Sequence, residues 1–71
     1  MKRENVESTM IKSIGYDQNT STLEAEFDSG AVWQYYGVSE SVYNDLKCAS
    51  SLGRFFKDEI IDQYSDKKVK R

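Results

Sequence analysis

The chain has 71 residues, of which 38% are hydrophobic and 31% are charged, and its formal net charge is −2. One cysteine and no histidine exclude an intramolecular disulfide and a zinc site built from the Cys and His of one chain. The missing histidine also removes the commonest general base, and no apolar run approaches the ~20 residues that a membrane span needs. We therefore expect one small cytoplasmic domain with no cofactor, no membrane contact and no evident small-molecule substrate.

The charge is distributed unevenly along the chain. Residues 9–64 carry nine acidic and four basic side chains, whereas residues 65–71 carry four basic side chains and one acidic one. Polar chain ends are often poorly ordered, so we expect residues 1–8 to be flexible and residues 65–71 to form a basic, flexible tail. The folded domain is predicted between residues 9 and 64.

Three segments in the first half of the chain have the pattern of β-strands. In residues 10–16 the alternation breaks between Ile11 and Ile14, which indicates a bulge or a strand that starts late. Residues 22–28 alternate apolar with acidic side chains, a pattern that predicts a half-buried strand. Residues 31–36 are rich in β-forming residues and predict the third strand.

The loop between the second and third strands decides which way the aromatic side chains of the third strand point. A two-residue loop would place Trp33 and Tyr35 beside the acidic side chains. A three-residue loop, with Gly30 in the left-handed conformation, pairs Phe27 with Ala31 and turns both aromatic rings to the apolar face. We prefer the three-residue loop because it buries the larger aromatic area.

The second half of the chain predicts two helices. Ser39 is expected to cap the first, and Ser50 and Ser51 can cap the second. In the second helix apolar residues recur every four positions from Leu52 to Tyr64. Two amphipathic helices can cover the apolar face of a small sheet. The predicted fold class is therefore α+β, a three-stranded antiparallel meander followed by two helices packed on one face (βββαα).

The sequence contains few candidates for catalytic or metal-binding residues. Glu24, Glu26 and Asp28 share one strand face, but carboxylates spaced ~6–7 Å apart on a flat strand are too open for a metal ion, and we expect a solvated face. Cys48 is expected to be a partly buried, unreactive residue because it lies near a helix C-terminus. No nucleophile–base pair, metal-ligand cluster or glycine-rich phosphate loop is present. We expect no catalytic activity.

A series of short motifs runs through about residues 8–64. They are Ile-Gly-Tyr-Asp (14–17), Leu-Glu-Ala-Glu-Phe (23–27), Ser-Gly (29–30), Trp-Gln-Tyr (33–35), Gly-Val (37–38), Val-Tyr (42–43), Ala-Ser-Ser-Leu-Gly (49–53) and Phe-Phe (55–56). In this order and spacing they resemble the KTSC domain, a module found alone in bacterial proteins and at the C-terminus of some lysyl-tRNA synthetases. Trp33 replaces the first tyrosine of the family's Tyr-x-Tyr motif, and Ser39 stands where proline is frequent. The synthetase context implies an association with RNA.

Two functions remain open after this comparison of patterns. The resemblance implies a small non-catalytic module that binds RNA weakly, with aromatic rings stacking on bases and cations meeting phosphates. The candidate residues for that contact are Trp33, Tyr35, Arg54, Lys57, Lys67, Lys68, Lys70 and Arg71. A competing interpretation makes Trp33 and Tyr35 core residues. The alternative function is a protein-interaction module whose acidic sheet face or helix pair meets a basic protein partner.

Overall fold

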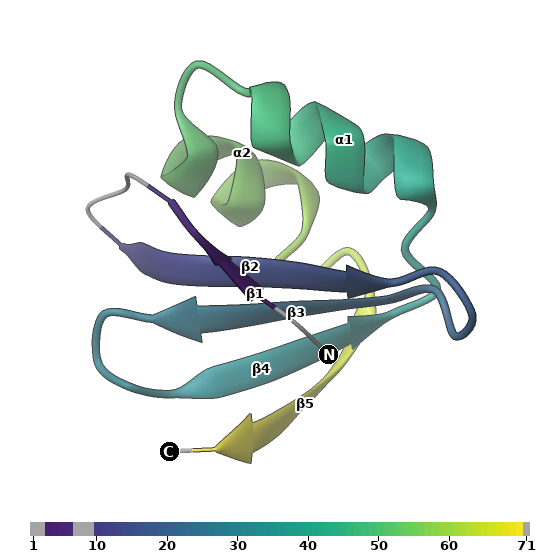
Figure 1. The fold of residues 1–71 in the computed structure, drawn as a ribbon, viewed down its shortest axis with the longest axis horizontal. Coiled ribbons are helices and arrows are strands. Elements are labelled where there is room, and N and C mark those ends of the chain that lie inside the picture. Colours follow the sequence, from purple (N-terminus) through teal and green to yellow (C-terminus); the bar gives the residue numbers. More distant parts are fainter. Residues whose placement is uncertain (1–2, 7–9, 71) are drawn as a thin grey trace.

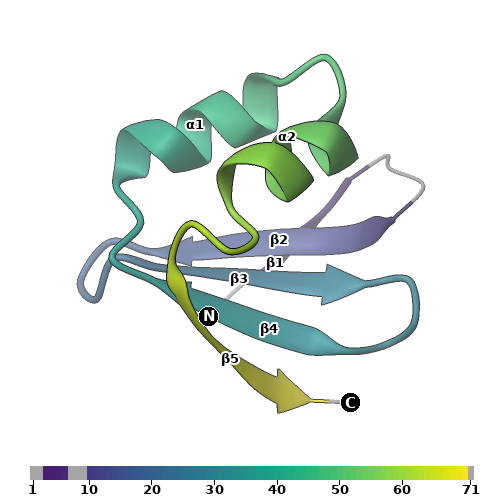
Figure 2. The same cartoon turned by 180° about the vertical axis from the view of Figure 1, so that it is seen from behind.

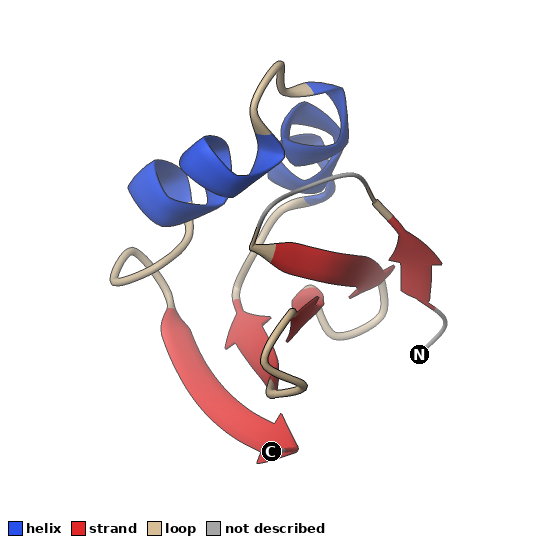
Figure 3. Ribbon diagram, turned by 90° about the vertical axis from the view of Figure 1, so that its left-hand side faces the viewer, coloured by secondary structure: helices blue, strands red, loops and turns tan. Residues whose placement is uncertain are grey.

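The computed structural model describes residues 3–6 and 10–70 and has two helices stacked on one face of an antiparallel sheet (Figures 1 and 3). The elements are β1 (Arg3–Asn5), β2 (Ile11–Asp17), β3 (Thr22–Phe27), β4 (Val32–Tyr36), α1 (Glu40–Cys48), α2 (Leu52–Glu59) and β5 (Ser65–Lys70). The five strands follow one another across the sheet in chain order. The α+β class and the two helices are confirmed, but five strands replace the three of the predicted βββαα order. Across these described residues, no helix is long and apolar enough to cross a membrane.

The hairpin between β3 and β4 has the predicted three-residue loop. The Phe27 N–H donates to the Ala31 carbonyl at 2.9 Å, and Gly30 has a φ of 95°, in the left-handed region that glycine adopts without steric cost. Trp33 consequently lies opposite Ala25. Both aromatic side chains of the β4 motif therefore share the sheet face with the apolar residues of β3.

The predicted irregularity at the start of β2 is a bulge. The pairing of β2 with β3 shifts between Ile11 and Ser13. Ile11 and Ile14 are three residues apart, and both are fully buried. The extra residue turns both side chains toward the helices, which an unbroken two-residue alternation would not do.

The hydrophobic core lies between the sheet and the two helices, with Phe56 of α2 at its centre. The Phe56 side chain is 0% exposed. The Phe27 and Tyr35 rings meet it edge to face, with centroid distances of 5.7 Å and 5.2 Å. The buried core residues are Ile11, Ile14, Leu23, Ala25, Tyr35, Val38, Leu46, Phe56 and Ile60.

Serine side chains begin both helices, as predicted. The Val42 N–H donates to Ser39 Oγ at 3.3 Å, and the Arg54 N–H donates to Ser51 Oγ at 3.4 Å. Each hydroxyl thereby satisfies a backbone donor that the first helical turn leaves unpaired.

The second helix is shorter than the spacing of apolar residues predicted. It ends at Glu59, whereas the periodic pattern continues to Tyr64. Asp62 has a φ of 67°, and aspartate is one of the few residues that tolerate this left-handed conformation. The chain therefore leaves the helix at this point and turns back toward the sheet.

The two outer strands lie in segments that the sequence predicted to be flexible. Residues 65–71 were expected to form a tail, but Ser65–Lys70 pairs with β4 along its length as β5, which Figure 2 shows on the outer side of β4. Residues 1–8 were expected to be flexible, but Arg3–Asn5 pairs with β2 as β1. Backbone hydrogen bonds form both pairings, and because they require no particular side chains, these polar segments can pair without an apolar alternation in the sequence.

The sheet face turned away from the helices is held by an ion-pair network, which corrects the prediction of a solvated acidic face. Arg3 Nη1 lies 2.5 Å from Glu24 Oε2, and Arg3 Nη2 lies 3.8 Å from Glu26 Oε1. The Gln34 amide donates to the other oxygen of Glu24 at 2.9 Å. Glu24 is consequently only 8% exposed and Glu26 is half-buried, whereas Asp28 is exposed in the hairpin loop.

Removing the guanidinium should reveal how much this network stabilises the fold. We expect Arg3→Met to lower the free energy of unfolding by about 1–3 kcal/mol, because it leaves the Glu24 carboxylate nearly buried without its cation. Glu24→Gln added to Arg3→Met should recover most of the loss. Urea denaturation measures both effects, with Lys12→Met as a control that removes an exposed cation from β2. Equal unfolding midpoints for Arg3→Met and the control would contradict the prediction.

Candidate functional site

The residues predicted to contact nucleic acid lie on two adjacent strands and on one helix. Trp33 and Tyr35 are on β4, Arg54 and Lys57 are on α2, Lys67, Lys68 and Lys70 are on β5, and Arg71 lies outside the described residues. The β4 and β5 members are therefore neighbours across the sheet, whereas Arg54 and Lys57 lie on a helix.

Two of the three aromatic residues of β4, Trp33 and Tyr35, pack against the core. Tyr35 is 3% exposed and meets Phe56 edge to face, so the interpretation of Tyr35 as a core residue is confirmed. Trp33 is half-buried and packs against the same core. A base can stack only on an exposed ring face. Tyr35 does not present one in this structure.

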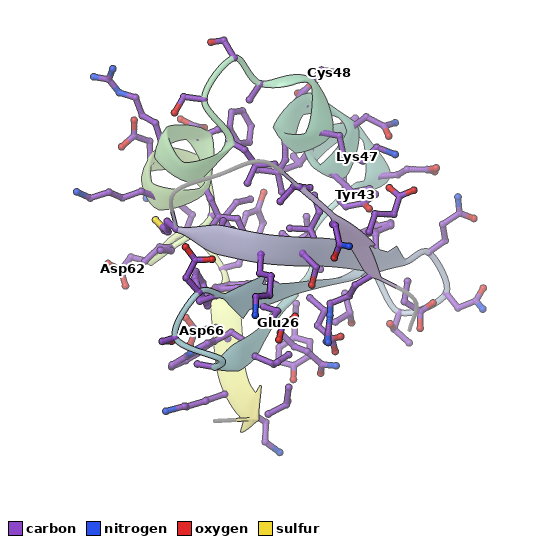
Figure 4. All side chains as sticks on the ribbon, turned by 60° about the vertical axis from the view of Figure 1, so that its left-hand side comes forward. Glu26, Tyr43, Lys47, Cys48, Asp62 and Asp66 are labelled. Carbon is purple, nitrogen blue, oxygen red and sulfur yellow. The ribbon has the colours of Figure 1, made fainter. Side chains whose placement is uncertain are left out.

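Trp33 and Tyr35 instead line a pocket between the end of α2 and β5, which we call the α2–β5 pocket. It has a volume of about 290 Å³ and is lined by Phe27, Trp33, Tyr35, Ile61, Asp62 and Asp66. The left-handed turn at Asp62 brings the chain from α2 to β5, where Asp66 pairs with Tyr35 across the sheet. Figure 4 shows both aspartates on the side of the molecule where α2 passes into β5. The sequence analysis missed this site.

The two carboxylates make the α2–β5 pocket electronegative. Burial of the Tyr35 phenol, followed by the negative charges of Asp66 and Asp62, raises its pKa to about 12. The phenol therefore stays neutral at physiological pH, since an unperturbed tyrosine already has a pKa near 10. Phosphate would be repelled here and a cation attracted.

The basic side chains of β5 point to both faces of the sheet. Lys67 pairs with Gln34 and Lys68 pairs with Trp33, and consecutive strand residues project to opposite faces. Both lysines are exposed. Lys67 therefore lies on the face that carries the Arg3 network, and Lys68 lies on the face that carries Trp33.

The basic residues of α2 have acidic neighbours. Arg54 is exposed and lines a pocket of about 350 Å³ at the junction of the two helices, together with Phe55, Asp58 and Glu59. Lys57 is exposed on the same helix. Two carboxylates beside Arg54 reduce the positive potential that a phosphate would meet at this junction.

The first helix carries Tyr43, which stacks on Tyr16 of β2, and the exposed thiol of Cys48. The Tyr16 and Tyr43 rings stack with centroids 5.0 Å apart, and Lys47 Nζ lies 5.0 Å from the centre of the Tyr43 ring. Burial and the charge of Glu4 raise the pKa of Tyr43. Cys48 is exposed, so the prediction of partial burial is wrong (Figure 4). Its position at the last residue of α1 points its side chain to solvent.

A polar pocket of about 470 Å³ lies on the open face of the sheet. It is lined by Asp17, Thr20, Thr22, Gln34 and Tyr36. Several of these groups already bind one another: the Tyr36 hydroxyl donates to Gln34 at 3.1 Å, and the Thr20 hydroxyl donates to Thr22 at 2.9 Å. Over the part of the chain that the structure describes, no three His, Cys, Asp or Glu residues gather as metal ligands would.

Comparison with known proteins connects this fold to one family. The family model of the KTSC domain matches residues 7–64. The chain is 48% identical over 54 residues to a lysine–tRNA ligase of Nostoc punctiforme, covering 76% of this chain but 10% of the ligase. It is 41% identical over 64 residues to an uncharacterized protein of Stutzerimonas stutzeri, covering 90% of each.

A solved structure extends the similarity beyond the matched segment. The crystal structure of a KTSC domain protein from Yersinia pestis is 37% identical, has a TM-score of 0.93 and aligns over 96% of each chain. The family model ends at residue 64, one residue before β5 begins. The structural agreement therefore covers more of the chain than the family model does. The chain belongs to the KTSC domain family.

Proposed function

We propose that this KTSC domain is a non-catalytic module that associates with RNA through the basic strand β5. The observation that carries the proposal is the exposure of Lys67 and Lys68 on an ordered strand at the edge of the sheet. Cations held on a strand lose less freedom on meeting phosphates than cations on a flexible tail would. Lys70 and Arg71 continue the basic run along the sequence.

The relatives support an RNA partner. Similar segments are part of lysine–tRNA ligases, whose name states a tRNA substrate, and this chain matches about 10% of such a ligase. Because the matched segment is such a small part of the ligase, only an association with RNA is proposed here. We propose that it takes place in the cytoplasm.

The charge of the domain limits the strength of the contact. The net charge is −2, and the acidic side chains lie mainly between residues 9 and 64. Binding to a polyanion through a few lysines should therefore be weak and strongly dependent on salt. A non-catalytic role agrees with the absence of histidine from the sequence and with the position of Cys48 at the end of α1.

Charge reversal on β5 tests the proposal. We expect wild-type protein to bind labelled single-stranded RNA and tRNA at low ionic strength, and Lys67→Glu/Lys68→Glu to weaken binding at least about tenfold. For single-stranded RNA the log–log salt slope should become flatter by about 1.4, from the rough 0.7 per phosphate. Fluorescence anisotropy over a salt series measures both quantities.

A matched control separates a β5 site from a general effect of charge. Lys12→Glu/Lys47→Glu changes the net charge equally but on β2 and α1, where both lysines are exposed. We expect this variant to lose much less affinity than the β5 variant. Equal losses in the two variants, or no RNA binding by wild type at low salt, would refute the proposal. Circular dichroism confirms that both variants are folded.

A further inference from the structure

The walls of the α2–β5 pocket are aromatic and held in place by the core. Phe27 and Tyr35 both meet the buried Phe56 ring edge to face, at 5.7 Å and 5.2 Å. Trp33 completes the aromatic lining, and Ile61 adds an aliphatic wall. A ligand that enters would therefore meet rings that are already oriented, with little ordering left to do.

The rim of the α2–β5 pocket carries two carboxylates, Asp62 and Asp66. Among the described side chains, no Lys or Arg forms an ion pair with Asp62 or Asp66, whereas Glu24 and Glu26 are both paired with Arg3. Lys68 lies next to Trp33 across the sheet but is exposed. The negative charge that acts on the Tyr35 phenol is thus available to a ligand from outside.

We infer that the α2–β5 pocket binds a lysine or arginine side chain presented by a basic polypeptide partner. The cationic head would lie over the face of an aromatic ring, of which tryptophan gives the strongest attraction, and would be balanced by Asp62 and Asp66. The methylene stem would pack against Ile61 and Phe27. The pocket does not suit Mg²⁺ or Ca²⁺, because these ions require about six oxygen ligands and two carboxylates line it.

The size and charge of the pocket favour this occupant. Its volume of about 290 Å³ lies at the lower limit of the roughly 300–1,000 Å³ of small-molecule sites, which suits a single side chain. Asp62 and Asp66 repel the phosphates of RNA, so the pocket recognises a different partner from the one proposed for β5. Lys67 lies on the other face of the sheet from Trp33, whereas Lys68 is the cross-strand neighbour of Trp33.

Trp33 is the only tryptophan in the chain, so its fluorescence reports directly on the pocket. The probe is an acetylated, amidated peptide of alternating lysine and glycine, and the control is the same peptide with glutamate in place of lysine. We expect the lysine peptide to shift the Trp33 emission with a saturable dependence on concentration. We expect the glutamate peptide to leave the emission unchanged.

Isosteric removal of the two charges completes the test. Asp62→Asn/Asp66→Asn should weaken the lysine peptide about tenfold, and asparagine also tolerates the left-handed backbone at position 62. Asp28→Asn/Asp45→Asn removes two exposed carboxylates elsewhere and should change the affinity less than about twofold. An unchanged Trp33 emission, an equal response to the glutamate peptide, or equal losses in the two variants would overturn the inference.

The β5 variant distinguishes a failure of the RNA proposal from a failure of this inference. Lys67→Glu/Lys68→Glu abolishes the proposed phosphate contact but leaves the lining of the α2–β5 pocket intact. We expect that variant to bind the lysine peptide at least as tightly as wild type, since two like charges are removed from the neighbourhood of the cation. Weaker peptide binding by that variant would count against the pocket.

Discussion

Replacing Phe56 with alanine is expected to remove most of the stability of the fold. Phe56 is 0% exposed and joins α2 to the Phe27 and Tyr35 rings. Truncation of a fully buried phenylalanine costs about 3–5 kcal/mol, through lost transfer free energy and the cavity that remains. Domains have about 0.05–0.15 kcal/mol of stability per residue, so the loss is comparable to the whole for a chain of this length.

The neighbouring phenylalanine provides the control for this prediction. Phe55 is half-buried at the junction of the helices, so Phe55→Ala should cost clearly less than Phe56→Ala. Urea denaturation followed by circular dichroism measures the free energy of unfolding of both variants. If Phe56→Ala is unfolded, the milder substitution Phe56→Leu replaces it in the comparison. Similar losses for Phe55→Ala and Phe56→Ala would show that the core is not centred on Phe56.

Removing residues 65–71 is expected to lower the thermal midpoint by roughly 10–20 °C. The deletion removes β5, which pairs with β4 from Tyr36 to Val32, and uncovers the edge of the strand that carries Tyr35. A loss of about 2–3 kcal/mol corresponds to this shift, since each kcal/mol moves the midpoint of a small domain by about 4–8 °C. A flexible tail would predict no change at all.

A neutral variant separates the contribution of the β5 backbone to the thermal midpoint from that of the lysine charges. Lys67→Gln/Lys68→Gln keeps the backbone of β5 and should leave the midpoint close to that of wild type, because both side chains are exposed. Differential scanning calorimetry compares the two variants. A thermal midpoint that is unchanged by the deletion would mean that the pairing of β4 with β5 contributes little to stability.

The sequence predicted those parts of the fold that local patterns specify. Phe27, Ala31 and Gly30 fix the hairpin, because only one loop length buries the aromatic residues of β4 and gives glycine the left-handed position. Ser39 and Ser51 begin their helices through contacts within one turn. Each of these interactions joins residues a few positions apart, so the sequence displays both partners together.

The outer strands could not be predicted because their partners are distant and their side chains are polar. In β5 the only apolar residue is Val69, which is 43% exposed. In β1 the decisive contact joins Arg3 to Glu24, which are 21 residues apart. Backbone pairing and a long-range ion pair hold these segments, and neither produces a hydrophobic period.

The sequence analysis missed the α2–β5 pocket because the apolar spacing predicted that α2 continues to Tyr64, whereas it ends at Glu59. A helix that continued to Tyr64 would leave Asp62 among the solvated residues of its outer side. The left-handed turn at Asp62 instead directs the chain to β5 and brings Asp66 beside Tyr35. The four-residue spacing of the two aspartates does not indicate a pocket, since residues four apart are also neighbours on a helix surface.

The place of β5 in the chain has a consequence for the order in which the molecule folds. The strands β2, β3 and β4 are joined by short turns, whereas residues 37–64 separate β4 from β5. Contacts that close a longer loop cost more entropy and form later, so we expect β5 to dock onto a sheet and helix pair that have already assembled. The α2–β5 pocket would then be the last part of the molecule to form. An occupant of that pocket would also hold the final strand in place.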